Sequence, residues 1–429
     1  MSYIPSTYRV LNSDSLPAYL STKLPKEIIL GGEPSSWKVD EVGDGNINLV
    51  FIVSGSQSTI VVKQAIPYVR AAGESWALSL QRAFFEYNTL KLEYENVGRS
   101  LVPDVYFYDE SMATFAMEYI SPHIVLRKEM IKGKKFDSLA NDIGTFLARN
   151  LFFTSDIGLN AKDKKELTSK FSLNHELCKI TEDLIFTEPY YDAERNNWST
   201  PLLDEHIYHI WSNKELIRIA MKYKYKFMTE AQALLHGDLH TGSIMVTKDK
   251  TIIIDPEFGF MGPMAFDIGN YIGNLIMSYT SQPAHIKNKN QLKDYQTWIL
   301  EQINDTWDKF VSEFTQLWNA KQEGDAYPNE IYQQKTMKKS LIIELQYDFF
   351  RNVFIDTLVN AGMEINRRVI GFAGVADLKT ISDENERAYC CHHALNIGCY
   401  LMLNASKFNT IYDVSDYIRS SNGEVKYEN

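Results

Sequence analysis

Strand-forming residues are concentrated in the first third of the chain, and this one-sided distribution most strongly restricts the folds open to it. Short runs rich in β-branched and aromatic residues occupy residues 37–42, 49–54 and 58–63, and a Gly-Ser-Gln turn separates the last two. Two further runs follow at residues 102–108 and 113–120. Five short strands over this length predict a compact β-rich unit.

A helical pattern begins inside the β-rich unit and dominates after it. Apolar residues recur at helical spacing over roughly 75–95, which predicts one helix inserted after the third strand. Amphipathic segments then follow at residues 136–153, 203–226, 291–321, 338–361 and 385–406. We therefore predict an α+β chain with a β-rich N-terminal lobe at residues 1–121 and a larger, mainly helical lobe at residues 122–429.

Composition excludes several classes of protein. A hydrophobic fraction of 45% supplies a large core, so disorder is excluded as the main state. The formal net charge of −11 argues against a nucleic-acid partner, because binding phosphates needs a surplus of positive charge. We find no run of ~20 apolar residues and no signal peptide, so no membrane association is expected. Four cysteines without a CxxC pair fit a reducing, cytoplasmic setting.

The strongest functional signal is the sequence LHGDLHTGSIM at residues 235–245. It places Asp238 in a polar turn, and an apolar strand then leads to Asp255, Pro256 and Glu257. A hairpin of this length can bring Asp238 and Asp255 to the same end of the hairpin. One carboxylate can then orient a hydroxyl while the other holds a divalent cation. Phosphoryl transfer needs these two roles, because its catalysis consists mostly of positioning the reactants and neutralising negative charge. A single Asp more often caps a turn or ends a strand, but the whole string favours chemistry.

Two histidines flank Asp238 at the i,i+4 spacing of a zinc site. His236 and His240 nevertheless lack the glutamate of a zinc-protease helix, and Gly237 would break the helix that aligns them. We therefore expect hydrogen bonds within the turn rather than a metal.

A glycine-rich segment lies between the first two predicted strands. Gly43 and Gly45 allow the backbone to approach a ligand closely, and Asn46 or Asn48 can donate a side-chain hydrogen bond to phosphate. The same residues also suit an ordinary hairpin turn, so this signal is weak alone.

Lys63 ends the third predicted strand, where a lysine is usually a solvated surface residue. The order of features changes that interpretation. A glycine-rich hairpin, a strand lysine, a helix with an acidic residue, two strands and an Asp loop form the layout of a kinase nucleotide cleft. Lys63 is then expected to bind the α- and β-phosphates, with Glu86 holding the lysine. Glu74 is a competing partner, because helix registers are uncertain by a few residues.

Several long segments resemble the methylthioribose kinases, small-molecule kinases of methionine salvage in the aminoglycoside-phosphotransferase and choline-kinase superfamily. The segments are HGDLHTGSIM, IDPEFGFMGPMAFDIGNYIGNL, EVGDGNINLVFIV, VVKQAIPYVRAAGESW, MEYISPHIVLRK and INRRVIGFAGVADLK. They extend from about residue 40 to residue 380 and cover most of the chain. The resemblance implies a bilobal protein-kinase-like fold, a homodimer, and transfer of the γ-phosphate of ATP to the 1-hydroxyl of 5-methylthio-D-ribose with Mg²⁺.

The resemblance also implies roles for individual residues. Asp238 would orient the anomeric hydroxyl and accept its proton. Asp255 and Glu257 would ligate Mg²⁺. Kinases of the wider superfamily carry Asn five positions after the catalytic Asp, where this chain has Ser243, but the methylthioribose kinases share the serine.

Two further groups receive roles by the same resemblance. The backbone of the strand connecting the lobes would pair with adenine. That strand comprises Met117, Glu118, Tyr119 and Ile120. Arg367 and Arg368 would lie near the sugar and hold its hydroxyls and the emerging phosphate. Adjacent arginines usually form a solvated face, and helical neighbours diverge by about 100°, so the sequence does not show which one faces the cleft.

Two other functions remain open from the sequence. One is a kinase of the same fold acting on an aminoglycoside, choline or homoserine. Cationic acceptors favour an acidic cleft, whereas Arg367 and Arg368 argue for a neutral or anionic acceptor. The other is a catalytically dead nucleotide-binding regulator, which the intact Lys63, Asp238, Asp255 and Glu257 disfavour.

Overall fold

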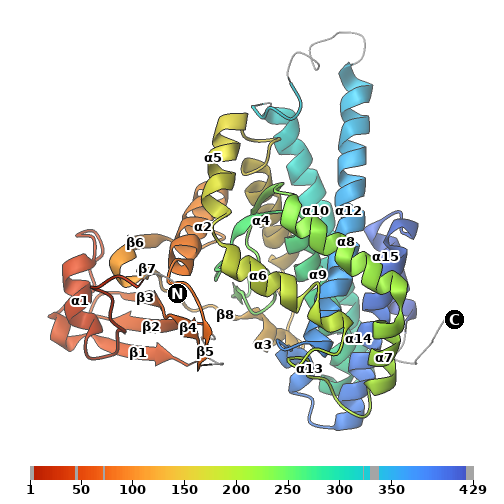
Figure 1. The fold of residues 1–429 in the computed structure, drawn as a ribbon, viewed down its shortest axis with the longest axis horizontal. Helices are drawn as coiled ribbons and strands as arrows, with labels where there is room; N and C mark the ends of the chain where they lie inside the picture. Colours follow the sequence, from red (N-terminus) through yellow and green to blue (C-terminus); the bar gives the residue numbers. More distant parts are fainter. Residues whose placement is uncertain (1–3, 44–46, 71–72, 322, 329–337, 422–429) are drawn as a thin grey trace.

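The computed structural model describes residues 4–43, 47–70, 73–321, 323–328 and 338–421. Figure 1 shows a β-rich lobe at the left and a larger helical lobe at the right. This arrangement confirms the predicted α+β fold of two lobes. Within the described ranges, no helix combines the length and the apolar character needed to cross a lipid bilayer.

The N-terminal lobe is built on a five-stranded antiparallel sheet in the order β1-β2-β3-β7-β6. The strands are β1 (Lys38–Val42), β2 (Asn48–Ser54), β3 (Thr59–Ala65), β6 (Val105–Asp109) and β7 (Thr114–Glu118). All five fall within or beside the runs that predicted them. The central strand, β3, is covered on both faces and is therefore almost entirely buried.

The pleat of β3 decides which side chains face which layer. Ile60 and Val62 point to the face covered by the N-terminal segment and its helix α1 (Leu16–Lys23). Val61 points to the opposite face, which is covered by helix α2 (Arg82–Val97). Because side chains alternate along a strand, Lys63 points to the same face as Val61, toward α2. The sheet thus presents this lysine to the inserted helix.

The inserted helix begins several residues later than its apolar spacing predicted. Residues Gly73–Ala77 form strand β5, which pairs with β4 (Tyr68–Val69) in a separate hairpin. Within β5, Trp76 packs against Phe372 of the larger lobe, with ring centroids 6.2 Å apart. This contact between the lobes outweighs the local helical pattern, and α2 begins only at Arg82.

The larger lobe is organised around helix α9 (Ala265–His285), in which every residue from Ala265 to Gln282 is buried. Helices α12 (Lys338–Ile370), α14 (Glu384–Asn404) and α10 (Lys289–Ala320) pack against it, and α10 also packs against α4 (Leu139–Phe153). No helix was predicted at α9, because a helix that is buried all round lacks the amphipathic pattern used to find it.

The predicted helix at residues 203–226 is in fact two helices, α7 (Asp204–Ser212) and α8 (Lys214–Thr229). The side chain of Asn213 accepts hydrogen bonds from the N–H groups of Glu215 and Leu216, which ends one helix and caps the next. The lobe also contains α3 (Leu126–Ile131), α5 (Ala161–Phe171), α6 (His175–Leu184), α13 (Ala376–Lys379) and α15 (Ile411–Ser420).

Short strands carry the loops that the sequence singled out. They are β8 (Ile124–Val125), β9 (Ala233–Leu235), β10 (Ile244–Val246), β11 (Thr251–Ile253) and β12 (Phe260–Gly262). β10 pairs with both β11 and β8, and β9 pairs with β12. The loop from β9 to β10 and the loop from β11 to β12 therefore start from neighbouring small sheets and can share one site.

Candidate active site

The turn that follows β9 presents Asp238. Gly237 has a φ of +83°, and a Cβ there would lie 2.2 Å from the carbonyl oxygen of Phe258, so glycine is required. The carboxylate of Asp267, in the first turn of α9, accepts hydrogen bonds from the N–H groups of His236 and Gly237 at 2.7 and 3.0 Å. The buried helix α9 therefore fixes the backbone immediately before Asp238.

The two histidines form the hydrogen bonds within the turn that were expected of them. His240 Nδ1 accepts from the N–H groups of Gly242 and Ser243, both at 3.0 Å, so its proton lies on Nε2, which is 3.3 Å from Asp238 Oδ2. His236 Nδ1 accepts from the N–H of Asp238. Ser243 Oγ lies 3.0 Å from the carbonyl oxygen of Asp238, so this serine braces the turn.

Arg367 and Arg368 both reach Asp238. Their Nη2 atoms lie 3.0 and 3.1 Å from Asp238 Oδ1, and both arginines are buried. Burial alone would raise the pKa of Asp238, but His240 and the two arginines hold that pKa well below its ordinary value. The side chain of Asp238 is 27% exposed, so the ionised carboxylate is partly accessible to solvent.

The two arginines are held in turn by one buried carboxylate. Glu364 is fully buried and accepts from the Nε atoms of Arg367 and Arg368, the latter at 2.7 Å. Asn274 of α9 donates to Glu364 Oε1 at 2.9 Å. Burial would raise the pKa of Glu364, but the two guanidinium groups lower it. The arginine pair is therefore part of an ionic network and not a solvated face.

A second ionic cluster lies where the two lobes meet. Lys63 forms ion pairs with Glu86 of α2 and with Asp255, which follows β11. Burial lowers the pKa of Lys63, but Asp255 and Glu86 outweigh it and keep the lysine charged. The structure thus pairs Lys63 with Glu86, and the side chain of Glu74 lies outside the described residues.

Three carboxylates gather in this cluster. Glu86, Asp255 and Glu257 each place one oxygen within 4.8 Å of the others. Burial raises the pKa of Glu86 to about 7, and burial together with Asp255 and Glu86 raises the pKa of Glu257 well above its ordinary value. Asp255 has a φ of +72°, an uncommon conformation for a residue with a side chain. Crowded oxygen ligands of this kind suit Mg²⁺, whose charge would relieve their repulsion.

The glycine-rich segment is only partly described. Gly43 follows β1 directly, and a Cβ there would meet no atom of the described residues within 4 Å, whereas Gly45 and Asn46 lie outside those residues. Asn48 is buried and donates to Glu86 and Glu257, at 3.3 and 2.9 Å, so its amide serves the carboxylate cluster.

The predicted adenine-binding strand is β7 and the residues after it. Met117 is buried opposite Val61, and the N–H of Glu118 donates to the carbonyl of Asp104 at 2.8 Å. Glu118, Tyr119 and Ile120 also line a cavity of about 710 Å³ with residues of α4. The lining of that cavity does not include Lys63, Asp238 or Asp255, so we do not assign it to the catalytic cluster.

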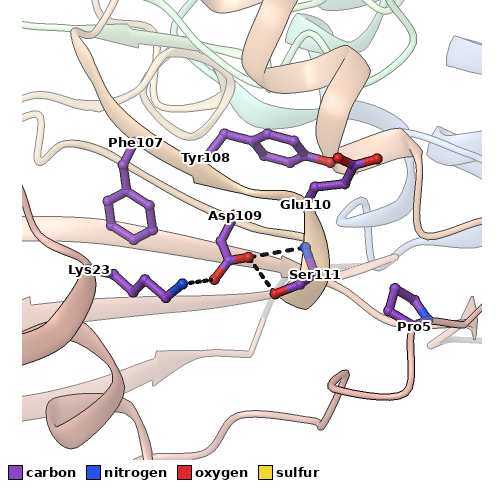
Figure 2. A pocket seen from close by; sticks show the side chains of 7 residues that line it. All are labelled: Pro5, Lys23, Phe107, Tyr108, Asp109, Glu110 and Ser111. Atoms are coloured by element: carbon purple, nitrogen blue, oxygen red, sulfur yellow. Dashed lines mark hydrogen bonds and ion pairs between the residues drawn. The ribbon is translucent and has the colours of Figure 1, made fainter.

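Another hollow, of about 490 Å³, lies in the N-terminal lobe beside β6 (Figure 2). Asp109 accepts hydrogen bonds there from the backbone and hydroxyl of Ser111, and Lys23 lies 2.9 Å from its other oxygen. Tyr19 donates to the same carboxylate. These charged groups already satisfy one another, so their role is to fasten α1 to the sheet.

Several residues of the site were missed from the sequence. They are Arg127, Asp267, Asn274, Glu364 and Asp377. Only Glu364 carries a local signal, because it precedes the two arginines by three and four residues, the spacing of neighbours on one helix face. The others contact the site from elements distant in sequence.

Most of this chain is similar in sequence to known proteins. Residues 38–298 match the phosphotransferase enzyme family. The chain is 59% identical to the methylthioribose kinase of Escherichia coli O45:K1 (strain S88 / ExPEC), over 96% of this chain and 97% of the relative. It is 38% identical to methylthioribose kinase 1 of Oryza sativa subsp. japonica, over 96% of each. It is 41% identical to the methylthioribose kinase of Geobacillus sp. (strain WCH70), over 87% of this chain and 88% of the relative.

Proposed function

The chain belongs to the methylthioribose kinases of the phosphotransferase enzyme family, and we propose that it transfers the γ-phosphate of ATP to the 1-hydroxyl of 5-methylthio-D-ribose at Asp238. Family membership establishes a small-molecule kinase that acts on methylthioribose. The meeting of Asp238 with Arg367 and Arg368, at 3.0 and 3.1 Å, carries the assignment of the acceptor site.

The two carboxylate oxygens of Asp238 have different roles in the proposed reaction with the acceptor. Oδ1 takes both guanidinium groups, whereas Oδ2 has, among the described residues, only His240 Nε2 beside it, at 3.3 Å. Oδ2 is therefore the oxygen that would accept a hydrogen bond from the sugar hydroxyl and then its proton. A neutral sugar becomes anionic as phosphate arrives. Arg367 and Arg368 are placed to neutralise that charge with planar, charge-assisted hydrogen bonds.

The nucleotide would lie over the Lys63 cluster. Lys63, held by Glu86, would bind the α- and β-phosphates, and Asp255 and Glu257, flanking Pro256, would ligate Mg²⁺. Mg²⁺, when bound, supplies positive charge that neutralises the phosphates. The residues proposed to contact adenine or the phosphates through their backbone or turn are Gly43, Gly45, Asn46, Met117, Glu118, Tyr119 and Ile120.

We place the boundary between the lobes near residue 121. Strand β8 begins at Ile124 and pairs with β10 of the larger lobe, which supports a boundary just before it. The resemblance to the family supports a cytoplasmic homodimer that acts in methionine salvage.

A panel of acceptors in a coupled ADP-release assay tests the proposed function. We expect the highest kcat/KM with methylthioribose. Ribose should fall about 10–200-fold below it, because it lacks the apolar methylthio group. Choline and an aminoglycoside should be poorer still, because Arg367 and Arg368 oppose a cation. A cationic acceptor that matches methylthioribose would contradict the proposal, and ATP binding without ADP formation for every acceptor would indicate a dead kinase.

The metal assignment predicts a specific kinetic change. Asp255→Ala and Glu257→Ala should each raise the Mg²⁺ concentration needed for half-maximal rate by about tenfold or more, because each removes a hard oxygen ligand. Nucleotide binding measured without metal should change less. The exposed Asp137 provides a matched control, Asp137→Ala, that should titrate with Mg²⁺ like the wild type. A Glu257→Ala protein with the wild-type titration would show that this ligand is wrong.

A further inference from the structure

One carboxylate organises both arginines of the acceptor site. Glu364, Arg367 and Arg368 lie on one face of α12, and the two oxygens of Glu364 accept from the two Nε atoms. This leaves the terminal Nη2 atoms to converge on a single oxygen, Asp238 Oδ1. Adjacent helical residues ordinarily diverge by about 100°, so this convergence needs an anchor.

We propose that Glu364 is a positioning residue of the kinase, which aims both arginines at Asp238 and balances their charge. The inference rests on the proposed function, because it acts through the acceptor site described above.

The charge balance gives Glu364 a chemical effect as well as a structural one. Two guanidinium groups face two carboxylates, Glu364 and Asp238, in a largely buried space. Without the charge of Glu364, the arginines would hold Asp238 more strongly, and a carboxylate so held accepts a proton less readily. The side chain at position 364 thus controls how much positive charge Asp238 and the arriving phosphate experience.

A second route ties Glu364 to the same turn as Asp238. Asn274 donates to Glu364 Oε1 at 2.9 Å and accepts from Arg127 Nη2 at 2.7 Å. Arg127 Nε donates to Thr241 Oγ1 at 3.0 Å, and Thr241 follows Asp238 in the same turn. Both ends of the Asp238–arginine contact are therefore fixed to α9 through Asn274.

The test compares Glu364→Gln with a matched control, Glu313→Gln. Glu313 also bridges two cations, Arg149 and Lys309, at 2.6 and 2.7 Å, but between helices α4 and α10. We expect Glu364→Gln to lower kcat/KM for methylthioribose about 10–100-fold, with KM for ATP unchanged, because one arm of a charge-assisted network is lost. The Glu313→Gln protein should keep the wild-type kinetics.

A double-mutant cycle separates positioning from general loosening of the fold. In a background with Arg367→Ala and Arg368→Ala, the further change Glu364→Gln should cost less than about threefold, because the groups through which it acts are gone. An equal loss in both backgrounds, or Glu364→Gln kinetics that match those of Glu313→Gln, would overturn the inference.

A milder variant keeps the test informative if Glu364→Gln does not fold. Asn274→Ala removes the donor to Glu364 and the acceptor of Arg127 but leaves the charge of Glu364, so kcat/KM for methylthioribose should fall about 3–10-fold. Wild-type kinetics in that variant would overturn the inference. Failure of the wild-type protein to phosphorylate methylthioribose would instead overturn the proposed function, so the two failures are distinguishable.

Discussion

Replacing Asp238 by Asn is expected to lower kcat by about 10²–10⁴-fold, the usual contribution of a positioned general base. Asparagine preserves the shape of the side chain but cannot accept the proton of the sugar hydroxyl. Its amide oxygen can still accept from both arginines, which lie 3.0 and 3.1 Å from Asp238 Oδ1, but it lacks the charge that neutralises the two guanidinium groups. Steady-state kinetics with each substrate varied in turn should show the loss in kcat and little change in KM for ATP.

The control for this variant is Asp137→Asn, in the exposed segment just before α4. It makes the same change of charge in the same lobe and should leave kcat unchanged. An Asp238→Asn protein that retains more than roughly a tenth of the wild-type kcat would contradict a general-base role.

Lys63→Met should lower kcat/KM for ATP by about 10²–10³-fold, the cost of removing one preorganised group that stabilises charge in a transition state. It should also lower the free energy of unfolding by about 3–5 kcal/mol, because it leaves the fully buried Glu86 without its cation. Chemical denaturation of the nucleotide-free protein measures the second effect separately from the kinetics.

Two further variants serve as comparisons for Lys63→Met. Lys293→Met removes an exposed lysine of the larger lobe and should change neither quantity. Lys63→Arg keeps the charge and should restore much of the stability while remaining kinetically impaired, because a planar fork does not match a point charge. Wild-type kcat/KM for ATP in Lys63→Met would remove this residue from the nucleotide site.

The sequence predicted those parts of the fold and site in which neighbouring residues carry the information. The strands of the N-terminal sheet follow from β-branched runs. The order of elements suggested Glu86 as the partner of Lys63 but left Glu74 open, and the structure pairs Lys63 with Glu86. The turn around Asp238 was likewise evident, because its glycine and polar residues form one continuous string.

The remainder depended on packing between distant segments. Trp76 belongs to a strand because its ring contacts Phe372 of the other lobe, and no local pattern reports that contact. Asp267 and Asn274 lie on a helix buried on all sides, which has no polar face to mark it. The sequence also left open which arginine faces the cleft, whereas the structure brings both to Asp238.

The burial of α9 on all sides has a consequence for how the protein is made. During synthesis α9 leaves the ribosome before α10, α12 and α14, the helices that cover it. Until the C-terminal third has been translated, the nascent chain therefore exposes the apolar residues of α9 that are buried in the finished protein, and exposed apolar surface favours aggregation. The core of the larger lobe therefore cannot be completed before α14 has been translated.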